Sequence, residues 1–403
     1  MKKIATISFI MAASLYGATD TDAQIKALEA KLNELQNQNM LIIEELGKLK
    51  EEKEVTGTES FTGMGVAASK VYRSDSALSI GGYGEMSYVN KNTEDPVSDL
   101  YRFIPYIGYK FSDTIIMNTE LEWEHGGKES EGGYVIVEFS YLDFLIHKNA
   151  NIRVGHILVP MGNINLRHEP PLYLGVNRPE TEKYVIPSTW HHNGMLVFGD
   201  ITETVSYQAG IVDSLNGDAM INEDIREGRQ SARNKHSNNA SFVARIDYTD
   251  ASMGLNVGIS ALKGKLNYDG NTTLEAIDPD ITMFDIHLTY KSGGVDLKAL
   301  YARADLSDED VIGYEGSEGY YVSLGYDIMP LINAGSKAEF LPFVRYEVYD
   351  KVITDADDEK TNTTVGFNYK PLSNVVIKAD YMITEQTGSD DVKAVELGLG
   401  YLF

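Results

Sequence analysis

The sequence has no cysteine, and its 403 residues include only two tryptophans. The lack of cysteine excludes disulfide bonds, thiolate metal sites and the cysteine-linked lipid anchor of exported lipoproteins. No stretch approaches the roughly 20 consecutive apolar residues that a membrane-spanning helix needs. A basic surface is also missing, because 60 acidic residues outnumber 35 Lys and Arg and leave a formal net charge of −25. This charge argues against nucleic acid as a partner.

The first residues are typical of an export signal. Two lysines precede a mostly apolar run through Tyr16, and residues 21–23 suit cleavage before Gln24. We therefore expect a signal peptide over residues 1–23. An exported chain with neither a transmembrane helix nor a lipid anchor is either soluble or a membrane barrel.

Residues 24–53 have the pattern of a coiled coil. Apolar side chains recur alternately three and four positions apart, and Asn39 takes an a position, where a buried amide fixes register and strand number. We expect a periplasmic coiled coil that joins copies of the chain, with a single surface helix as the alternative. The residues expected to drive oligomerisation are Leu28, Leu32, Leu35, Asn39, Ile42 and Leu46. Residues 54–77 are rich in Gly, Ser and Thr without a period, which indicates a linker or a plug-like segment.

From residue 78 onward the sequence consists of short runs in which apolar and polar residues alternate. Sixteen such runs can be counted, each of roughly the length that crosses a bilayer at a tilt. The connections also alternate, being short at 112–114 and 147–150 but long at 161–191 and 214–239. Short turns on one side and long loops on the other are typical of an outer-membrane barrel. The sequence therefore predicts an all-β fold, a 16-stranded antiparallel transmembrane β-barrel over residues 78–403.

Three residues disagree with a regular barrel. Pro105 and Pro342 fall inside predicted strands, where a missing N–H removes a ladder bond, so we expect bulges there. Arg303 falls on the lipid-facing side of its strand, which a barrel tolerates only near the interface.

The opposite side of each strand carries charges of both signs, which a dry core could not hold. Facing cations and anions in a narrow pore favour small polar solutes. The loop at 161–191, together with Pro160 just before it, holds five of the eleven prolines, and we expect it to fold back into the barrel, with a position on the outer rim as the alternative. The residues expected to line the pore or its constriction are Arg102, Lys110, Glu120, Glu122, Arg153, Arg167, His168, Glu169, Arg178, Glu180, Lys183, Arg245, Arg345 and Glu347.

Catalytic and metal-binding patterns are weak. His191 and His192 are adjacent on a loop, which is not by itself the spacing of metal ligands. No serine, histidine and polar partner can be nominated as a hydrolytic trio. We expect no enzyme activity, no metal and no cofactor.

Four stretches carry a family resemblance: "AASKVY", "LSIGGYGEMSY", "GHILVPMGNIN" and the closing "VELGLGYLF". Over roughly residues 65–403 they resemble the phosphate-selective porin O and P superfamily of Gram-negative bacteria. The resemblance implies a trimeric 16-stranded barrel for passive uptake, and the helical segment before it is similar to the stalk of trimeric porins. It does not imply phosphate selectivity, which depends on a dense ladder of arginine and lysine, because this lumen is mixed in sign.

The sequence thus predicts an outer-membrane porin that conducts small hydrophilic solutes or ions, with outer-membrane lipid around it. Tyr401 and Phe403 in the last strand look like the signal read by the barrel-assembly machinery. Two alternatives stay open. One is a structural or adhesive barrel. The other is an anion or phosphate channel that uses Arg102, Arg153, Arg245 and Arg345.

Overall fold

The computed structural model describes residues 30–35, 38, 40, 60–234, 237–354 and 359–403, which belong to two compact units divided after Val55. In the first unit, residues 30–35 are helical, and the side chains of Leu32 and Leu35 are exposed. The predicted signal peptide lies outside the described residues, and so does most of the predicted coiled coil, including Leu28, Asn39, Ile42 and Leu46. No helix in the described ranges is long and apolar enough to cross a membrane.

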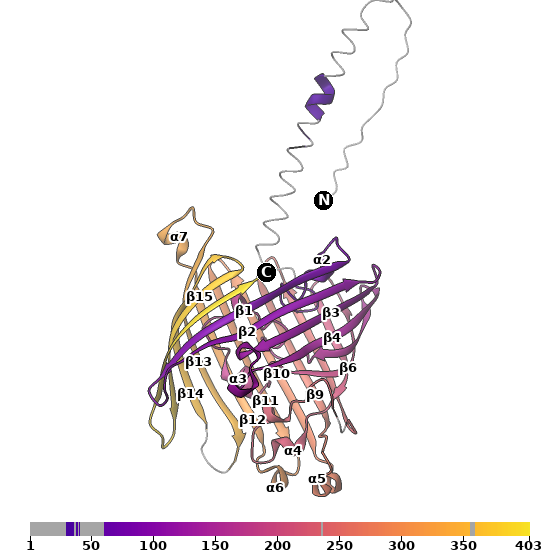
Figure 1. Cartoon of the computed structure of the whole chain (residues 1–403), viewed down its shortest axis with the longest axis vertical. Coiled ribbons are helices and arrows are strands. Elements are labelled where there is room, and N and C mark those ends of the chain that lie inside the picture. The colour runs from indigo at the N-terminus through magenta and orange to yellow at the C-terminus, as the bar shows by residue number, and fades with distance from the viewer. Residues whose placement is uncertain (1–29, 36–37, 39, 41–59, 235–236, 355–358) are drawn as a thin grey trace, which may run out of the picture. The chain divides into compact units, whose positions relative to one another are not determined.

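The second unit is a closed barrel of sixteen antiparallel strands (Figure 1). Each strand pairs with its neighbours in the sequence, and the last returns to pair with the first. The predicted fold class is therefore confirmed. The strands are β1 Leu78–Lys91, β2 Val97–Lys110, β3 Ile115–Glu124, β4 Tyr134–His147, β5 Ala150–Leu158, β6 His191–Asp200, β7 Val205–Asp213, β8 Ala240–Asp250, β9 Leu255–Lys265, β10 Asp280–Ser292, β11 Val295–Leu306, β12 Gly316–Tyr326, β13 Glu339–Ile353, β14 Lys360–Leu372, β15 Val375–Gln386 and β16 Val392–Leu402.

The barrel closes between β1 and β16. Phe403 donates its backbone N–H to Gly82 O at 2.9 Å, and Gly82 N–H donates back to Phe403 O at 3.0 Å. The Phe403 ring stacks on Phe103 of β2, with 5.9 Å between ring centroids. Because every strand has two partners, the described barrel has no open sheet edge, which is the exposed feature that otherwise promotes aggregation.

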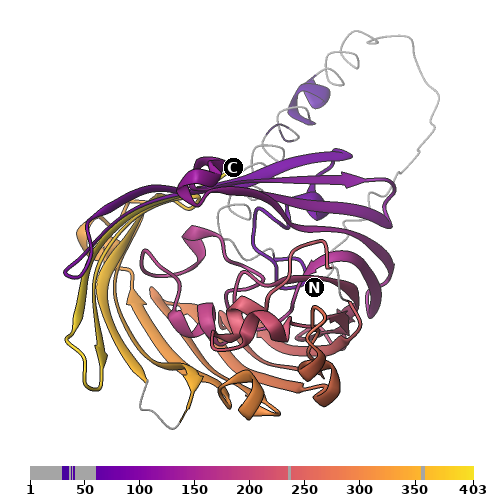
Figure 2. The same cartoon turned by 60° about the horizontal axis from the view of Figure 1, so that its bottom comes forward.

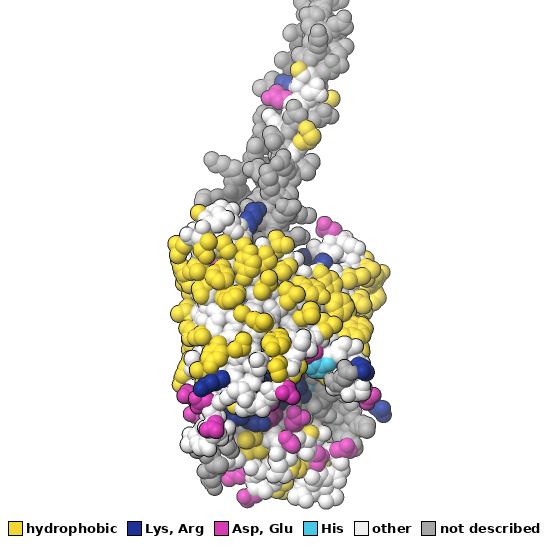
Figure 3. Space-filling view, turned by 60° about the vertical axis from the view of Figure 1, so that its left-hand side comes forward, with side chains coloured by type: hydrophobic (Ala, Val, Ile, Leu, Met, Phe, Trp, Pro, Cys, Tyr) yellow, Lys and Arg dark blue, Asp and Glu magenta, His cyan; other side chains and the backbone are white. Residues whose placement is uncertain are grey.

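The strands alternate between an apolar outer face and a polar inner face, as a period of two requires. On β2 the side chains of Arg102 and Tyr106 are buried inside, whereas Phe103 and Tyr109 are each 39% exposed outside. The space-filling view shows apolar side chains spread across the wall, with charged side chains gathered toward the end that carries the long loops (Figure 3). This outer face is suited to lipid and the inner face to water.

The two ends of the barrel differ in their connections. One end, called here the short-turn end, joins strands by two to four residues, except that residues 327–338 between β12 and β13 form a longer excursion containing α7. The other, long-loop end carries residues 159–190, 214–234 and 266–279, and the helices α4 to α6 mark it in Figure 1. The short helices are α2 Lys70–Arg73, α3 Glu180–Tyr184, α4 Gly217–Met220, α5 Thr272–Ile277, α6 Glu309–Ile312 and α7 Met329–Ile332, with 3-10 turns η1 His125–Gly127, η2 Glu129–Glu131, η3 Pro170–Leu172 and η4 Ile225–Gly228.

The expectation of bulges at the two prolines was wrong. Pro342 pairs with Phe367 in an unbroken ladder, and the pairing of β13 with β12 ends at Phe343, so the missing N–H has no partner strand beside it. Pro105 pairs with Gly82 of β1 without a register shift. On its other side, β2 is not paired with β3 between Phe103 and Tyr106. The shifts occur elsewhere, as at Glu85 to Ser87 on β1 and Glu120 to Leu121 on β3.

Arg303 lies near the long-loop end of β11, half-exposed on the outer face. Its guanidinium forms ion pairs with Asp305 at 2.7 Å and Glu318 at 2.6 Å. Pairing at the rim explains how this charge is tolerated on the outer surface of the strand.

Candidate functional site

The inner wall carries charged side chains that are paired with one another. Arg153 of β5 forms an ion pair with Asp143 of β4 at 2.8 Å, and Arg245 pairs with Asp247 on β8 at 2.6 Å. Arg102 lies between two carboxylates, 3.5 Å from Glu85 and 3.6 Å from Glu122. These guanidiniums are already neutralised by the wall and do not form a free cationic ladder.

The loop 159–190, between β5 and β6, lies inside the barrel. In the view from the long-loop end its magenta segment occupies the space within the ring of strands (Figure 2). Gly162 N–H donates to Asp285 of β10 at 3.0 Å, and Val176 N–H donates to Asp380 of β15 at 2.6 Å. Contacts to both of these strands show that the loop crosses the lumen.

Wall side chains also hold the middle of this loop. The Arg345 guanidinium donates to the backbone carbonyl of Leu174 at 3.2 Å and to that of Asn177 at 3.0 Å. The Asn368 amide bonds the backbone on the same stretch, donating to Tyr173 O at 2.9 Å and accepting from Gly175 N–H at 3.1 Å. Because buried backbone groups need partners, the inward polar residues of β13 and β14 fix the position of the loop.

Residues 60–77 lie along the inner wall beside β2, β3 and β4. The backbone N–H groups of Ala67 and Ala68 donate to the Glu169 carboxylate at 3.0 and 3.1 Å. Asn118 of β3 donates to Ala68 O at 2.8 Å, and Lys110 of β2 donates to Ser74 O at 2.6 Å. This segment therefore joins the crossing loop in narrowing the lumen.

A cavity of about 1030 Å³ lies at the short-turn end of the barrel. Its wall includes residues of the turns at 199–205 and 250–254 and part of the segment 60–66. Five basic and five acidic side chains line it, so its charge is balanced. They are Lys148, Arg167, Lys291, Lys298 and Lys370, with Asp200, Glu203, Asp247, Asp250 and Asp296.

The charges predicted on the crossing loop do not form one ring. Arg167 donates to Gly63 O at 3.2 Å, on the side of the lumen occupied by residues 60–77. The other group lies near β12 and β13, where Glu180 and Lys183 form an ion pair at 3.7 Å and Thr181 N–H donates to Glu347 at 2.6 Å. Arg178 lies between these two groups in the sequence, and its side chain is half-buried.

The predicted wall residues Arg102, Glu120, Glu122, Arg153, Arg245, Arg345 and Glu347 are all buried on the inner face, and Lys110 is half-buried there. Sequence reasoning missed Tyr173 and Asn368 as anchors of the loop, and it placed Glu182 among the constriction charges without its partners. No local pattern marks these contacts, because the bonds of Tyr173 to Glu85, Tyr321 to Glu182 and Asn368 to Tyr173 join residues 88, 139 and 195 positions apart.

Glu182 has an altered ionisation inside the loop. Its carboxylate accepts the N–H groups of Asn163 at 3.1 Å and Ile164 at 3.0 Å, and the Tyr321 hydroxyl at 2.8 Å. Burial nevertheless raises the pKa of Glu182 to about 7, against the lowering effect of the Ile164 N–H and the Tyr321 hydroxyl. This carboxyl is therefore suited to change its charge near neutral pH.

Solved structures with the same fold are outer-membrane porins and related proteins. The OmpT loop-deletion mutant of Vibrio cholerae matches with a TM-score of 0.55 at 13% identity, covering 81% of this chain and 99% of that one. The anion-selective porin of Comamonas acidovorans matches with a TM-score of 0.55 at 12% identity over the same shares. OmpF of Salmonella typhi, in complex with daunomycin, gives 0.54 at 13%, covering 81% of this chain and 97% of that one. The chain thus has the porin-type β-barrel fold.

A sequence relative gives the family. An uncharacterised protein of Aquifex aeolicus (strain VF5) is 34% identical over 376 residues, which cover 85% of this chain and 84% of that protein. The chain belongs to the same family as this Aquifex protein. No family model matches the sequence.

Proposed function

We propose that the protein is an outer-membrane porin, a passive aqueous channel for small hydrophilic solutes or ions. The observation that carries the proposal is a charged inner wall and a cavity of about 1030 Å³ inside a barrel whose outer face is apolar. Charged side chains on a lumen are stable when water reaches them, and an apolar exterior is stable in lipid. In this proposal the short turns face the periplasm and the long loops face outward.

The balance of charge favours weak selectivity. The cavity has equal numbers of acidic and basic side chains. Three of the four arginines required for an anion or phosphate channel, Arg102, Arg153 and Arg245, already contact carboxylates. An entering anion would have to compete with these fixed carboxylates, which weakens its binding.

We further propose a homotrimer whose N-terminal coiled coil lies in the periplasm. A trimer form is named for the OmpT protein of Vibrio cholerae, whose fold this chain shares. The heptad pattern of residues 24–53 supports association through the N-terminal segment. Tyr401 and Phe403 at the closing strand are proposed as the signal for the barrel-assembly machinery.

Liposome swelling tests the channel directly. Purified protein reconstituted in liposomes should admit sugars at rates that fall as sugar size rises, because a narrow aqueous pore sieves by radius. Liposomes with heat-denatured protein are the control. Correctly folded barrels that admit no sugar and carry no ion current would instead favour the structural or adhesive alternative.

A further inference from the structure

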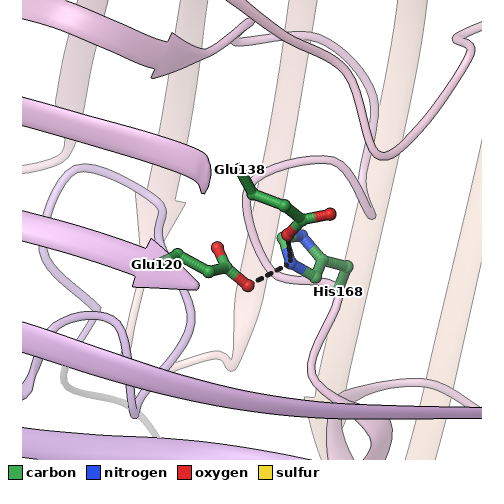
Figure 4. A group of neighbouring side chains, drawn as sticks. All are labelled: Glu120, Glu138 and His168. Atoms are coloured by element: carbon green, nitrogen blue, oxygen red, sulfur yellow. Dashed lines mark hydrogen bonds and ion pairs between the residues drawn. The ribbon is translucent and has the colours of Figure 1, made fainter. Parts of the chain in front are cut away.

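Three buried side chains from separate elements converge inside the barrel. Glu120 comes from β3, Glu138 from β4 and His168 from the crossing loop, and Figure 4 shows both carboxylates directed at one edge of the imidazole ring. The two glutamates are fully buried and His168 is 2% exposed. One ligand atom from each residue lies within 4.8 Å of the others.

The orientation of His168 is fixed by the backbone. Its Nδ1 lies 2.9 Å from the carbonyl oxygen of Asn165, and since a carbonyl oxygen only accepts, Nδ1 carries the hydrogen. In the neutral ring, Nε2 then presents a lone pair toward the two carboxylates. A histidine that donates one ring N–H to a carbonyl and presents the other nitrogen to a charged site has the arrangement usual for a metal ligand.

The distances suit a shared cation better than direct hydrogen bonds. His168 Nε2 lies 3.2 Å from Glu120 Oε1 and 3.3 Å from Glu138 Oε2. A charge-assisted N–H···O⁻ bond is usually about 2.7–2.9 Å long. Two ligand atoms at about 2.0–2.1 Å from a tetrahedral ion are about 3.3 Å apart. The observed separations match the spacing of two ligands of one tetrahedral ion.

The cluster also has few hydrogen-bond donors. Glu120 Oε2 and both carboxylate oxygens of Glu138 are buried without a hydrogen bond among the described residues, apart from the 3.3 Å contact of Glu138 Oε2 with His168 Nε2. Arg102, the cation of the neighbouring wall, is engaged by Glu85 and Glu122. With both carboxylates ionised and the imidazole neutral, as metal binding requires, the three groups carry a formal charge of −2, which a divalent cation would neutralise.

We propose that Glu120, Glu138 and His168 bind a divalent transition-metal ion of the Zn²⁺ type. Imidazole together with carboxylate favours zinc and similar ions over Mg²⁺ or Ca²⁺, which prefer oxygen ligands alone. The ion would join the crossing loop to β3 and β4 and hold one side of the loop against the wall. This proposal does not depend on the proposed channel function. Its residues are also not His191 and His192, the sequence neighbours that were considered above.

Titration of the full chain tests the site. The protein, folded in detergent and stripped with a chelator, should bind one Zn²⁺ per chain by calorimetry. Mutation of a residue that only hydrogen-bonds a metal ligand weakens metal binding by about 10- to 100-fold. Glu138→Gln removes a ligand itself, so it should weaken Zn²⁺ binding by about 100-fold or more. Glu347→Gln is the matched control, because Glu347 is also a buried wall carboxylate that contacts the loop, and it should bind as the natural protein does.

A second readout separates ligand loss from misfolding. Cobalt-loaded protein should show the visible absorption of a tetrahedral ion with a nitrogen ligand, and His168→Gln should lose this band while circular dichroism still reports a folded barrel. The proposal is overturned if the natural protein binds no Zn²⁺, which would leave the three side chains as a structural contact between the loop and the wall. It is equally overturned if Glu138→Gln binds Zn²⁺ as tightly as Glu347→Gln, which would place the ion on the acidic outer loops.

Discussion

Replacing Glu182 by Gln should change how the stability of the barrel depends on pH. Glu182 is fully buried in α3, and its carboxyl accepts two loop N–H groups and the Tyr321 hydroxyl. Burial raises the pKa of Glu182 from 4.5 to about 7, with nearby Asp285 raising it further and His287 lowering it. The neutral carboxyl is thus the form that the folded loop favours.

The magnitude follows from this pKa. Each unit of pKa corresponds to about 1.36 kcal/mol of free energy between the neutral and the ionised carboxyl. The rise from 4.5 to about 7 therefore makes ionisation of Glu182 about 3 kcal/mol less favourable in the folded protein. Because the folded protein holds the proton more tightly than the unfolded chain, the free energy of unfolding falls as pH rises between 4.5 and 7. Above this window the contribution no longer changes. Gln resembles the protonated carboxyl and cannot ionise. The free energy of unfolding of the variant should therefore lack the pH-dependent contribution of Glu182.

Urea unfolding at pH 5, 6, 7 and 8 measures the effect. The free energy of unfolding of the natural protein minus that of Glu182→Gln should fall by up to about 3 kcal/mol across the series. Taking this difference removes the contribution of the titrating groups that do not interact with Glu182. A difference that stays flat with pH would show that Glu182 titrates alike in the folded and unfolded states, and would refute the reasoning.

Three further predictions concern the loop, assembly and association. Arg345→Met removes two hydrogen bonds from a charged donor to loop carbonyls, each contributing about 1.5–3 kcal/mol, and should increase single-channel current and its fluctuations. The exposed change Lys393→Met is its control, and equal currents from the two variants would contradict the loop's role. Deleting Phe403 should lower the amount of barrel inserted more than the conductance per channel, and normal surface levels would argue against an assembly signal. Leu32→Asp with Leu35→Asp should reduce the oligomer mass measured by light scattering, and an unchanged mass would exclude these residues from association.

The strand pattern could be read from the sequence because it depends on local geometry. Side chains in a strand alternate between two faces, so the polar positions Arg102, Glu120 and Arg345 were placed on the inner wall by parity alone. The alternation of short and long connections then followed from where the runs end. Even the closing pair of strands could be anticipated, since a barrel must join its first strand to its last.

The contents of the lumen could not be read in the same way. The crossing loop has no period, and its position depends on bonds to strands far along the chain, such as that from Val176 to Asp380. Glu120, Glu138 and His168 come together only because the loop returns across β3 and β4, so their spacing in sequence resembles no metal motif. The bulges expected at Pro105 and Pro342 did not form, because a proline needs none where no partner strand faces its nitrogen.

Reversal potential across a planar bilayer tests the channel proposal most directly. Single barrels bathed in a tenfold KCl gradient should conduct continuously and reverse near zero voltage, because acidic and basic side chains are balanced around the cavity. A reversal potential close to the chloride limit, with phosphate blocking the chloride current, would contradict the account and identify an anion channel. Folded barrels without any current would contradict it more completely.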